Sequence, residues 1–189
     1  WAAHNGEINT IRGNKNWMRA REGLLRSEVF GDDLDLLYPI IENGGSDSAA
    51  FDNVLELLVI NKVLTLPQAV MLMVPEAWQG SEKDPAKVAF YQWAACLMEP
   101  WDGPALFTFC DGRYCGANLD RNGLRPCRWV TTNDDIMVCA SEVGTVAIPP
   151  ETITAKGRLR PGRMLLVDTV EGRIVDDREL KSSTAHLAD

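Results

Sequence analysis

The stretch Ala105-Leu106-Phe107-Thr108-Phe109-Cys110-Asp111-Gly112 decides the fold class of this chain, because an apolar strand runs directly into a hairpin turn. Residues 105–110 are largely apolar, and Asp111-Gly112 is a strong signal for a two-residue hairpin turn. Further strands are predicted over residues 113–119, 127–132, 136–140, 164–168 and 173–175. The short connections between several of them indicate antiparallel pairing.

The first half of the chain has helical patterns instead. Helices are predicted from Asn9 or Thr10 to about Leu25, and from Ser46 or Asp47 to about residue 62. Shorter helices are predicted up to residue 37, after a capping box at 65–68, after 84–85, and from residue 176. Helices followed by antiparallel strands predict an α+β layered domain rather than a doubly wound parallel sheet.

Composition narrows the classes of partner. The chain has 189 residues and a net charge of −8, so it lacks the clustered positive charge that nucleic acids and anionic membranes require. The longest strongly apolar stretch, residues 54–60, is too short to span a bilayer, and no secretory signal is visible. We therefore expect no nucleic-acid or membrane partner, and an intracellular location, cytoplasmic or organellar.

The cysteines indicate neither a disulfide framework nor a metal site. There are five, an odd number, and most of them lie in strand-like apolar runs. No C-x-x-C pair occurs and the chain has only two histidines, so no metal site is predicted. Buried thiols in a reducing compartment are the simplest interpretation.

The chain begins at Trp1 without an initiating methionine, and its most site-like residues follow within three positions. A complete domain seldom begins inside its own active site. We therefore expect residues 1–189 to be part of one larger domain.

The polar segment His4-Asn5-Gly6-Glu7 is interpreted as a turn that can carry chemistry. The amide of Asn5 and the backbone N–H of Gly6 can together stabilise an oxyanion, and glycine permits close approach because it has no Cβ. An ordinary Asn-Gly turn is the alternative, and the dipeptide alone favours it. His4 is expected to be a structural hydrogen-bond donor rather than a base.

Two carboxylates form the second candidate feature. Glu7 and Asp47 can hold the ammonium group of an amino-acid substrate through charge-assisted hydrogen bonds. From the residues alone, a solvated surface role for Glu7 and helix capping for Asp47 are favoured instead.

Two further polar segments are given mainly structural roles. In residues 119–126 we expect Asp120 to pair with Arg121 or Arg125, around a tight turn. Ser141 and Glu142 follow a predicted strand and can lie near a site. A serine-hydrolase triad is not predicted, because no histidine is available near Ser141.

Residues 3–10 and 12–22 closely resemble the large subunit of glutamate synthase, within its class II glutamine amidotransferase domain. Further segments resemble the same family in the same order, and together they extend the resemblance over nearly the whole chain. These segments are residues 45–48, 119–126, 140–144 and 156–162.

The resemblance implies an α/β/β/α sandwich of antiparallel sheets, as in N-terminal nucleophile hydrolases, here incomplete. It implies that Asn5 and Gly6 form the oxyanion hole and that Glu7 and Asp47 bind the substrate glutamine at its amino group. The family's nucleophile is an N-terminal cysteine, which has no counterpart at Trp1. The family's carboxylate-binding arginine also lies upstream of the matching region. The isolated chain is therefore expected to be inactive.

By the same resemblance, the parent protein releases ammonia from glutamine and uses it to make glutamate from 2-oxoglutarate. FMN and an iron–sulfur cluster are expected elsewhere in the parent, and no cofactor is expected in this segment. Glutamine and the remaining domains of the parent are the expected partners. Two alternatives stay open: a non-catalytic amino-acid-binding or interface module, and, less favoured, a different class II amidotransferase.

Overall fold

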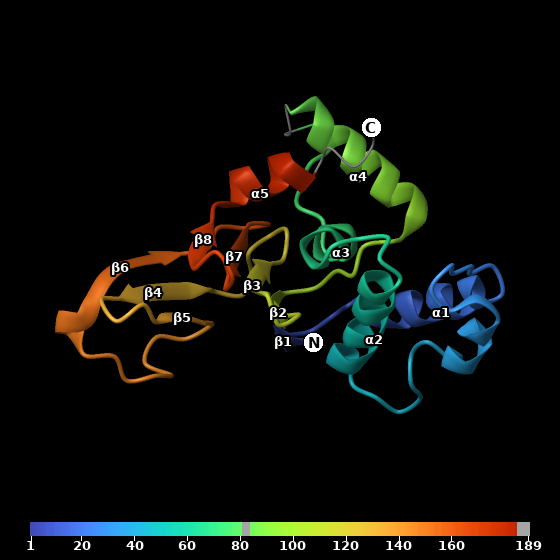
Figure 1. Cartoon of the computed structure of the whole chain (residues 1–189), viewed down its shortest axis with the longest axis horizontal. Helices are drawn as coiled ribbons and strands as arrows, with labels where there is room; N and C mark the ends of the chain where they lie inside the picture. The colour runs from blue at the N-terminus through green and yellow to red at the C-terminus, as the bar shows by residue number, and fades with distance from the viewer. Residues whose placement is uncertain (81–83, 185–189) are drawn as a thin grey trace.

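The structure is a computed structural model that describes residues 1–80 and 84–184 (Figure 1). Its helices lie mostly in the first half of the chain, as predicted. They are α1 (Ile11–Glu22), a 3₁₀ helix (Gly31–Leu37), α2 (Asp47–Ile60), α3 (Leu66–Met73), α4 (Pro85–Leu97) and, near the end, α5 (Asp177–Thr184). A second 3₁₀ turn spans Pro150–Thr152. His186 lies outside the described residues.

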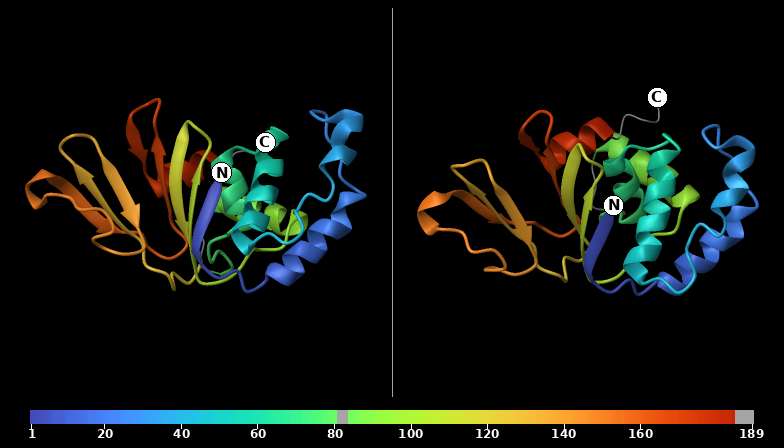
Figure 2. Two further views of the ribbon diagram at one scale, coloured as in Figure 1. Left: turned by 90° about the horizontal axis from the view of Figure 1, so that it is seen from below. Right: turned by 60° about the horizontal axis from the view of Figure 1, so that its bottom comes forward.

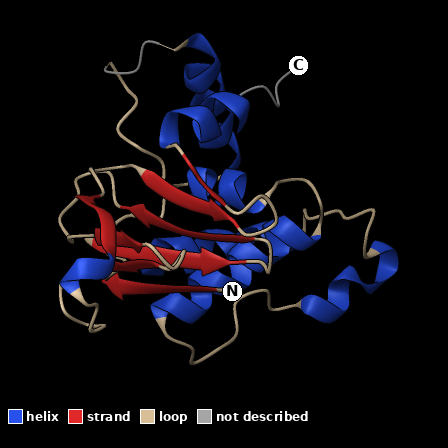
Figure 3. Ribbon diagram, turned by 60° about the vertical axis from the view of Figure 1, so that its left-hand side comes forward, coloured by secondary structure: helices blue, strands red, loops and turns tan. Residues whose placement is uncertain are grey.

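The strands form two antiparallel sheets. The larger sheet has the order β1-β2-β3-β7-β8, and the smaller has the order β5-β4-β6. The bounds are β1 (Ala2–Gly6), β2 (Ala105–Cys110), β3 (Tyr114–Leu119), β4 (Arg128–Thr132), β5 (Met137–Ala140), β6 (Ile153–Arg158), β7 (Met164–Asp168) and β8 (Arg173–Val175). Most of the helices lie on one side of the strands (Figure 3).

Strand β1 corrects the interpretation of residues 4–7 as a turn, because His4, Asn5 and Gly6 are extended in the larger sheet. They pair with β2, about a hundred residues later, in the register His4↔Phe107 and Asn5↔Leu106. The local Asn-Gly turn preference is thus overridden by long-range pairing. Strand β6 was not predicted either, since Lys156 and Gly157 are poor strand formers.

The main core lies between the larger sheet and the helices. Alternate residues of β2, Phe107 and Phe109, point to this side and are buried. Phe51 of α2 stacks on Phe107 with ring centroids 4.6 Å apart, and Trp101 meets Phe51 edge-on at 5.7 Å. Helix α2 lies beside β1 in both views of Figure 2. These aromatic contacts fix α2 against the β1 edge of the sheet.

The opposite face of the larger sheet looks toward the smaller sheet. A second apolar cluster joins the two sheets at one end, and it contains Leu106, Ala117, Leu119, Cys127 and Leu159. Away from this cluster the two sheets diverge (Figure 2). The order of layers is therefore helices, larger sheet, smaller sheet, and the predicted α+β fold with antiparallel sheets is confirmed. Within residues 1–80 and 84–184, no α-helix covers the far face of the smaller sheet.

A buried ionic cluster fastens the helices to the sheet. Lys181 of α5 has only 2% of its side chain exposed, and its Nζ lies 3.1 Å from Glu76 Oε2 and 3.0 Å from Asp177 Oδ1. Its ammonium also donates to the carbonyl of Gly162 at 2.8 Å. Burial alone raises the pKa of Asp177, but Lys181 and the other donors around it bring that pKa below its ordinary value. The cluster is thus a compensated set of buried charges.

The polar loop after β3 is structural, but its pairing differs from the prediction. Asp120 is buried and accepts hydrogen bonds from the N–H groups of Ala105, Asn122 and Leu124. Arg121 instead pairs with Asp102. A carboxylate placed at the start of a turn is satisfied by nearby backbone N–H groups, so Asp120 needs no arginine.

We expect Lys181→Met to lower the free energy of unfolding by about 3 kcal/mol, because it leaves the carboxylates of Glu76 and Asp177 buried without one of their cations. Denaturant unfolding measures this change. Lys156→Met, at an exposed position on β6, is the matched control and should stay within about 0.5 kcal/mol of the wild type. Equal effects of the two substitutions would contradict the compensating role of Lys181.

Candidate active site

The alternation of β1 sends neighbouring residues of the candidate motif to opposite faces of the larger sheet. His4 faces the helices, where its ring stacks on Phe107 with centroids 5.5 Å apart. Asn5 pairs with Leu106, which belongs to the cluster between the two sheets, so Asn5 faces the smaller sheet. His4 therefore lies in the core between the sheet and the helices, whereas Asn5 lies at the junction of the two sheets.

His4 connects β1 to the start of α2. Its side chain is 3% exposed, and its Nδ1 lies 2.5 Å from Ser48 Oγ while its Nε2 lies 3.3 Å from Asp47 Oδ2. The imidazole is enclosed by the Phe107 ring and two α2 side chains. The structure thus gives His4 the structural role that the sequence favoured.

Asp47 is the first residue of α2 but is not its cap. Ser46 is the N-cap and accepts a hydrogen bond from the N–H of Ala49 at 3.1 Å. The Asp47 carboxylate instead accepts from the N–H of Ile8 at 3.3 Å, just beyond β1. A quarter of the Asp47 side chain remains exposed. Asp47 therefore ties the end of β1 to α2 while keeping part of its carboxylate accessible.

Asn5 is exposed at the junction of the two sheets. Its Nδ2 donates to Ser141 Oγ at 3.0 Å, and Ser141 directly follows β5 of the smaller sheet. Sequence reasoning placed Ser141 near a site without a partner, and its contact with Asn5 follows only from the way the sheets meet. The amide of Asn5 is thus held at one end by a residue 136 positions later.

Gly6 occupies a place that no other residue fits. Its φ is +140°, and a Cβ built on it would lie 1.9 Å from the carbonyl oxygen of Pro104. The backbone at residues 6–7 and the backbone at residues 103–104 therefore cross at close range. The approach is equally close at Gly103, where a Cβ would lie 1.8 Å from the carbonyl oxygen of Glu7. Glycine at residue 6 therefore permits a backbone approach that a side chain would block.

The β1–β2 ladder leaves the N–H of Gly6 pointing away from β2. Trp1 and Cys110 exchange backbone hydrogen bonds, and the N–H of Glu7 donates to Pro104. In an antiparallel pair, hydrogen-bonded positions alternate, so Gly6 occupies a non-hydrogen-bonded position. Its N–H lies on the outer edge of β1, which pairs with no other strand in the part of the chain that the structure describes.

The four predicted site residues lie near one corner of the larger sheet, where β1 ends and α2 begins, but they are distributed over both of its faces. Asn5 and Gly6 are adjacent on β1, and Glu7 follows them, exposed. Asp47 reaches this corner from the helix side, whereas Asn5 looks toward the smaller sheet. The Asn5 amide and the Asp47 carboxylate have separate hydrogen-bond partners, Ser141 and the N–H of Ile8.

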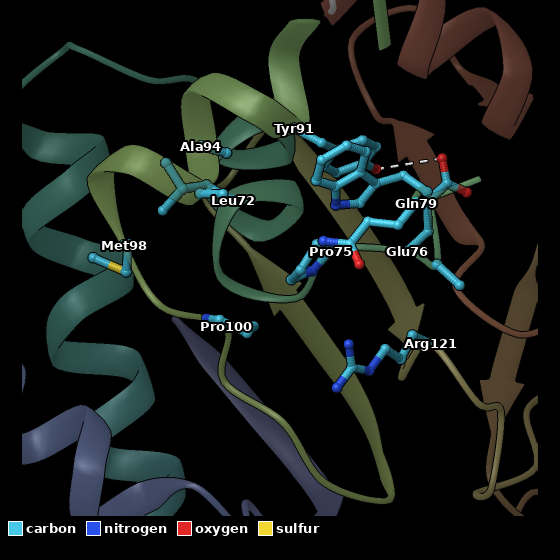
Figure 4. A pocket seen from close by; sticks show the side chains of 12 residues that line it. Leu72, Pro75, Glu76, Gln79, Tyr91, Ala94, Met98, Pro100 and Arg121 are labelled. Carbon is cyan, nitrogen blue, oxygen red and sulfur yellow. Dashed lines mark hydrogen bonds between the residues drawn. The ribbon is translucent and has the colours of Figure 1, made fainter. Parts of the chain in front are cut away.

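A separate cavity of about 320 Å³ lies within the helical layer, between α3 and α4 (Figure 4). Trp78 and Tyr91 stack along it at 6.1 Å. Burial raises the pKa of the Tyr91 hydroxyl, which lies 3.4 Å from Glu76. Arg121 reaches the cavity but pairs with Asp102. Because these polar groups have intramolecular partners, we assign the candidate site to the end of β1.

Two further findings concern metal binding and membrane crossing. Within the described ranges, no group of three or more histidine, cysteine, aspartate and glutamate residues is arranged to hold a metal ion. No helix in those ranges combines the length and the apolar character that crossing a bilayer requires.

Comparison with known proteins defines the class. The family model for class II glutamine amidotransferases matches residues 1–189. The chain therefore belongs to the class II glutamine amidotransferases.

Within that family, the similarity is to glutamate synthases. The NADH glutamate synthase of Schizosaccharomyces pombe is 70% identical over 189 residues, and that of Saccharomyces cerevisiae is 64% identical over 189 residues; each match covers 100% of this chain and 9% of the relative. The NADPH glutamate synthase large chain of Bacillus subtilis is 48% identical over 186 residues, which cover 98% of this chain and 12% of the relative. The resemblance seen in the sequence is thus confirmed, over about a tenth of these relatives' length.

Among solved structures, the glutamine phosphoribosylpyrophosphate amidotransferase from Bacillus subtilis, complexed with ADP and GMP, matches with a TM-score of 0.48 and 18% identity. The match covers 93% of this chain and 28% of that one.

Two glycine substitutions should affect stability in opposite directions. Gly6→Ala should lower the free energy of unfolding by about 2 to 3 kcal/mol, because the methyl group meets the Pro104 carbonyl and the backbone is strained. Gly13→Ala, in α1 with no atom within 4 Å of the new Cβ, should raise it by about 0.5 to 1 kcal/mol. Thermal and denaturant unfolding measure both. A Gly6→Ala variant as stable as the wild type would show that the Pro104 carbonyl does not approach residue 6 this closely.

Proposed function

We propose that this chain is the glutamine-hydrolysing part of a glutamate synthase, releasing ammonia from the side chain of glutamine. The observation that carries the proposal is that two hydrogen-bond donors are adjacent in β1. One is the exposed side-chain amide of Asn5, and the other is the backbone N–H of Gly6, which lies outside the β1–β2 ladder. Two such donors can bind the negative oxygen of a tetrahedral intermediate. Membership of the amidotransferase family supports the same chemistry.

In this proposal Glu7 and Asp47 bind the α-ammonium group of glutamine. Glu7 is exposed beside Gly6, and Asp47 keeps a quarter of its side chain accessible while it holds the N–H of Ile8. A carboxylate fixed by a backbone hydrogen bond is pre-organised, so less entropy is lost when a cation binds to it. Glutamine is therefore the proposed ligand of this corner.

The nucleophile is proposed to come from outside residues 1–189. The five cysteines of the chain are all internal, whereas an N-terminal nucleophile needs a sulfur next to a free α-amino group that acts as base. The remaining domains of the parent are the proposed partners and use the ammonia to convert 2-oxoglutarate to glutamate. FMN and an iron–sulfur cluster are proposed to lie there rather than in this segment.

The net charge of −8 supports the further proposal that the chain binds neither nucleic acids nor anionic membranes. An intracellular location, in the cytoplasm or an organelle, is proposed as well, and the five free cysteines are in keeping with a reducing compartment. A non-catalytic binding or interface module is the less favoured function, because the whole chain matches a family of glutamine-hydrolysing enzymes.

Asn5→Ala in the full-length protein should lower kcat for glutamine hydrolysis by about 10² to 10³-fold, the usual effect of losing one oxyanion donor. Glutamate release from glutamine measures this activity, and ammonia-dependent glutamate formation by the same variant should stay at the wild-type rate. Asn133→Ala, an exposed asparagine in a turn, is the matched control. A wild-type rate of glutamine hydrolysis in Asn5→Ala would overturn the proposed role.

Asp47→Asn separates the charge of Asp47 from its structural hydrogen bond. The amide oxygen can still accept from the N–H of Ile8, and only the local bond from the N–H of Ser48 to the other carboxylate oxygen is lost, so folding should be preserved. Loss of the negative charge should raise KM for glutamine about tenfold or more, the value of a charge-assisted hydrogen bond to the substrate ammonium. Steady-state kinetics at several glutamine concentrations measure it. An unchanged KM would assign Asp47 to structure alone.

A further inference from the structure

The cysteines form spatial pairs that the sequence does not predict. Cys110 ends β2 and Cys115 lies in β3, and the two residues are directly opposite in the register. Both the N–H and the C=O of Cys110 bond to Trp1 on the other side, so the Cys110–Cys115 position is non-hydrogen-bonded. Cα atoms at such positions are about 4.5 Å apart, within the range that a disulfide spans. The two sulfur atoms lie 3.0 Å apart.

This pair is accessible to small molecules. Both cysteines are partly exposed, and Cys115 lies on the same face of β3 as Ala117, toward the smaller sheet. The hairpin that carries them is far along the strands from the cluster that joins the sheets, where the two sheets have diverged (Figure 2). A thiol reagent can therefore reach the pair without local unfolding.

The surroundings of the two sulfurs differ. The backbone N–H of Gly112 points to Cys110 Sγ at 3.4 Å. A hydrogen bond to Cys110 is the main cause that raises the pKa of the Cys115 thiol to about 11, with burial adding to it. Cys115 therefore holds its proton more tightly than an ordinary thiol does, whereas the N–H of Gly112 donates to Cys110 Sγ. This arrangement marks Cys110 as the sulfur that attacks first.

We propose that Cys110 and Cys115 form a reversible dithiol–disulfide site that reacts with small disulfides such as oxidised glutathione. Cys110, as its thiolate, attacks one sulfur of the reagent, which forms a mixed disulfide and releases one glutathione. Cys115 loses its proton and attacks the Cys110 sulfur, which releases the second glutathione. Two protein thiols are oxidised to one disulfide, and the small disulfide is reduced to two thiols.

The site is suited to reversal rather than to permanent crosslinking. Only four residues separate Cys110 from Cys115, so the bond removes little entropy from the unfolded chain and adds little stability. Disulfides that gain little stability and are exposed are readily reduced.

The second cysteine pair provides an internal comparison. Cys127 and Cys139 also have sulfurs 3.0 Å apart, but Cys127 is fully buried. Cys139 is opposite Trp129 in the ladder, so the two cysteines are diagonal neighbours, whose Cα atoms are usually about 7 to 8 Å apart. A small disulfide should therefore oxidise the hairpin pair before the buried pair.

Peptide mapping of the full-length protein tests the proposal. The protein is equilibrated with oxidised and reduced glutathione, its remaining thiols are alkylated, and it is digested with trypsin. Cleavage after Lys87, Arg113 and Arg121 places Cys110 in peptide 88–113 and Cys115 in peptide 114–121. We expect these two peptides to be joined after oxidation, and dithiothreitol to separate them.

Two variants assign the link. Peptide 88–113 also contains the exposed Cys96, so the link should persist in Cys96→Ser and be lost in Cys110→Ser. The proposal is overturned if the link disappears in Cys96→Ser. It is equally overturned if Cys110 and Cys115 are fully alkylated in a buffer that places glutathione on Cys96, or if Cys127 and Cys139 oxidise first.

Discussion

The pairing of β1 with β2 is the constraint on which the rest of the structure depends. It joins residues 2–6 to residues 105–109, and so makes the first residues of the chain the edge strand of the larger sheet. The alternation of the pleat then assigns His4 to the helical core and Asn5 to the junction of the sheets. The close crossing at Pro104 fixes where the strand ends, and with it the positions of Glu7 and Ile8.

Elements that carry their own local signals could be predicted from the sequence. Ser46 caps α2, Thr65 and Gln68 form the capping box of α3, and Asp84 caps α4, each close to where the sequence places it. Strand β2 was predicted with the bounds that the structure gives. In each case the determining contacts lie within a few residues of one another.

Strand β1 and strand β6 could not be predicted, because their stability comes from distant partners. The hairpin after β2 also shifts: the N–H of Asp111 pairs with the carbonyl of Tyr114, so the turn is centred one residue later than Asp111-Gly112 indicated. In the site, family resemblance supplied the roles proposed for Asn5 and Asp47. The contact of Asn5 with Ser141 and the cysteine pairs depend on how strands meet, which a single sequence does not reveal.

The outer edge of β1 has a consequence for handling this chain in solution. Backbone groups along an unpaired strand template the addition of further strands, and proteins usually protect such edges with charge or with covering segments. The N–H of Ala2 already donates to Asp52. The backbone N–H and C=O groups of His4 and Gly6, however, point outward along the same edge. Residues 1–189 on their own therefore carry a risk of edge-to-edge aggregation, and the protein concentration during purification should be kept low.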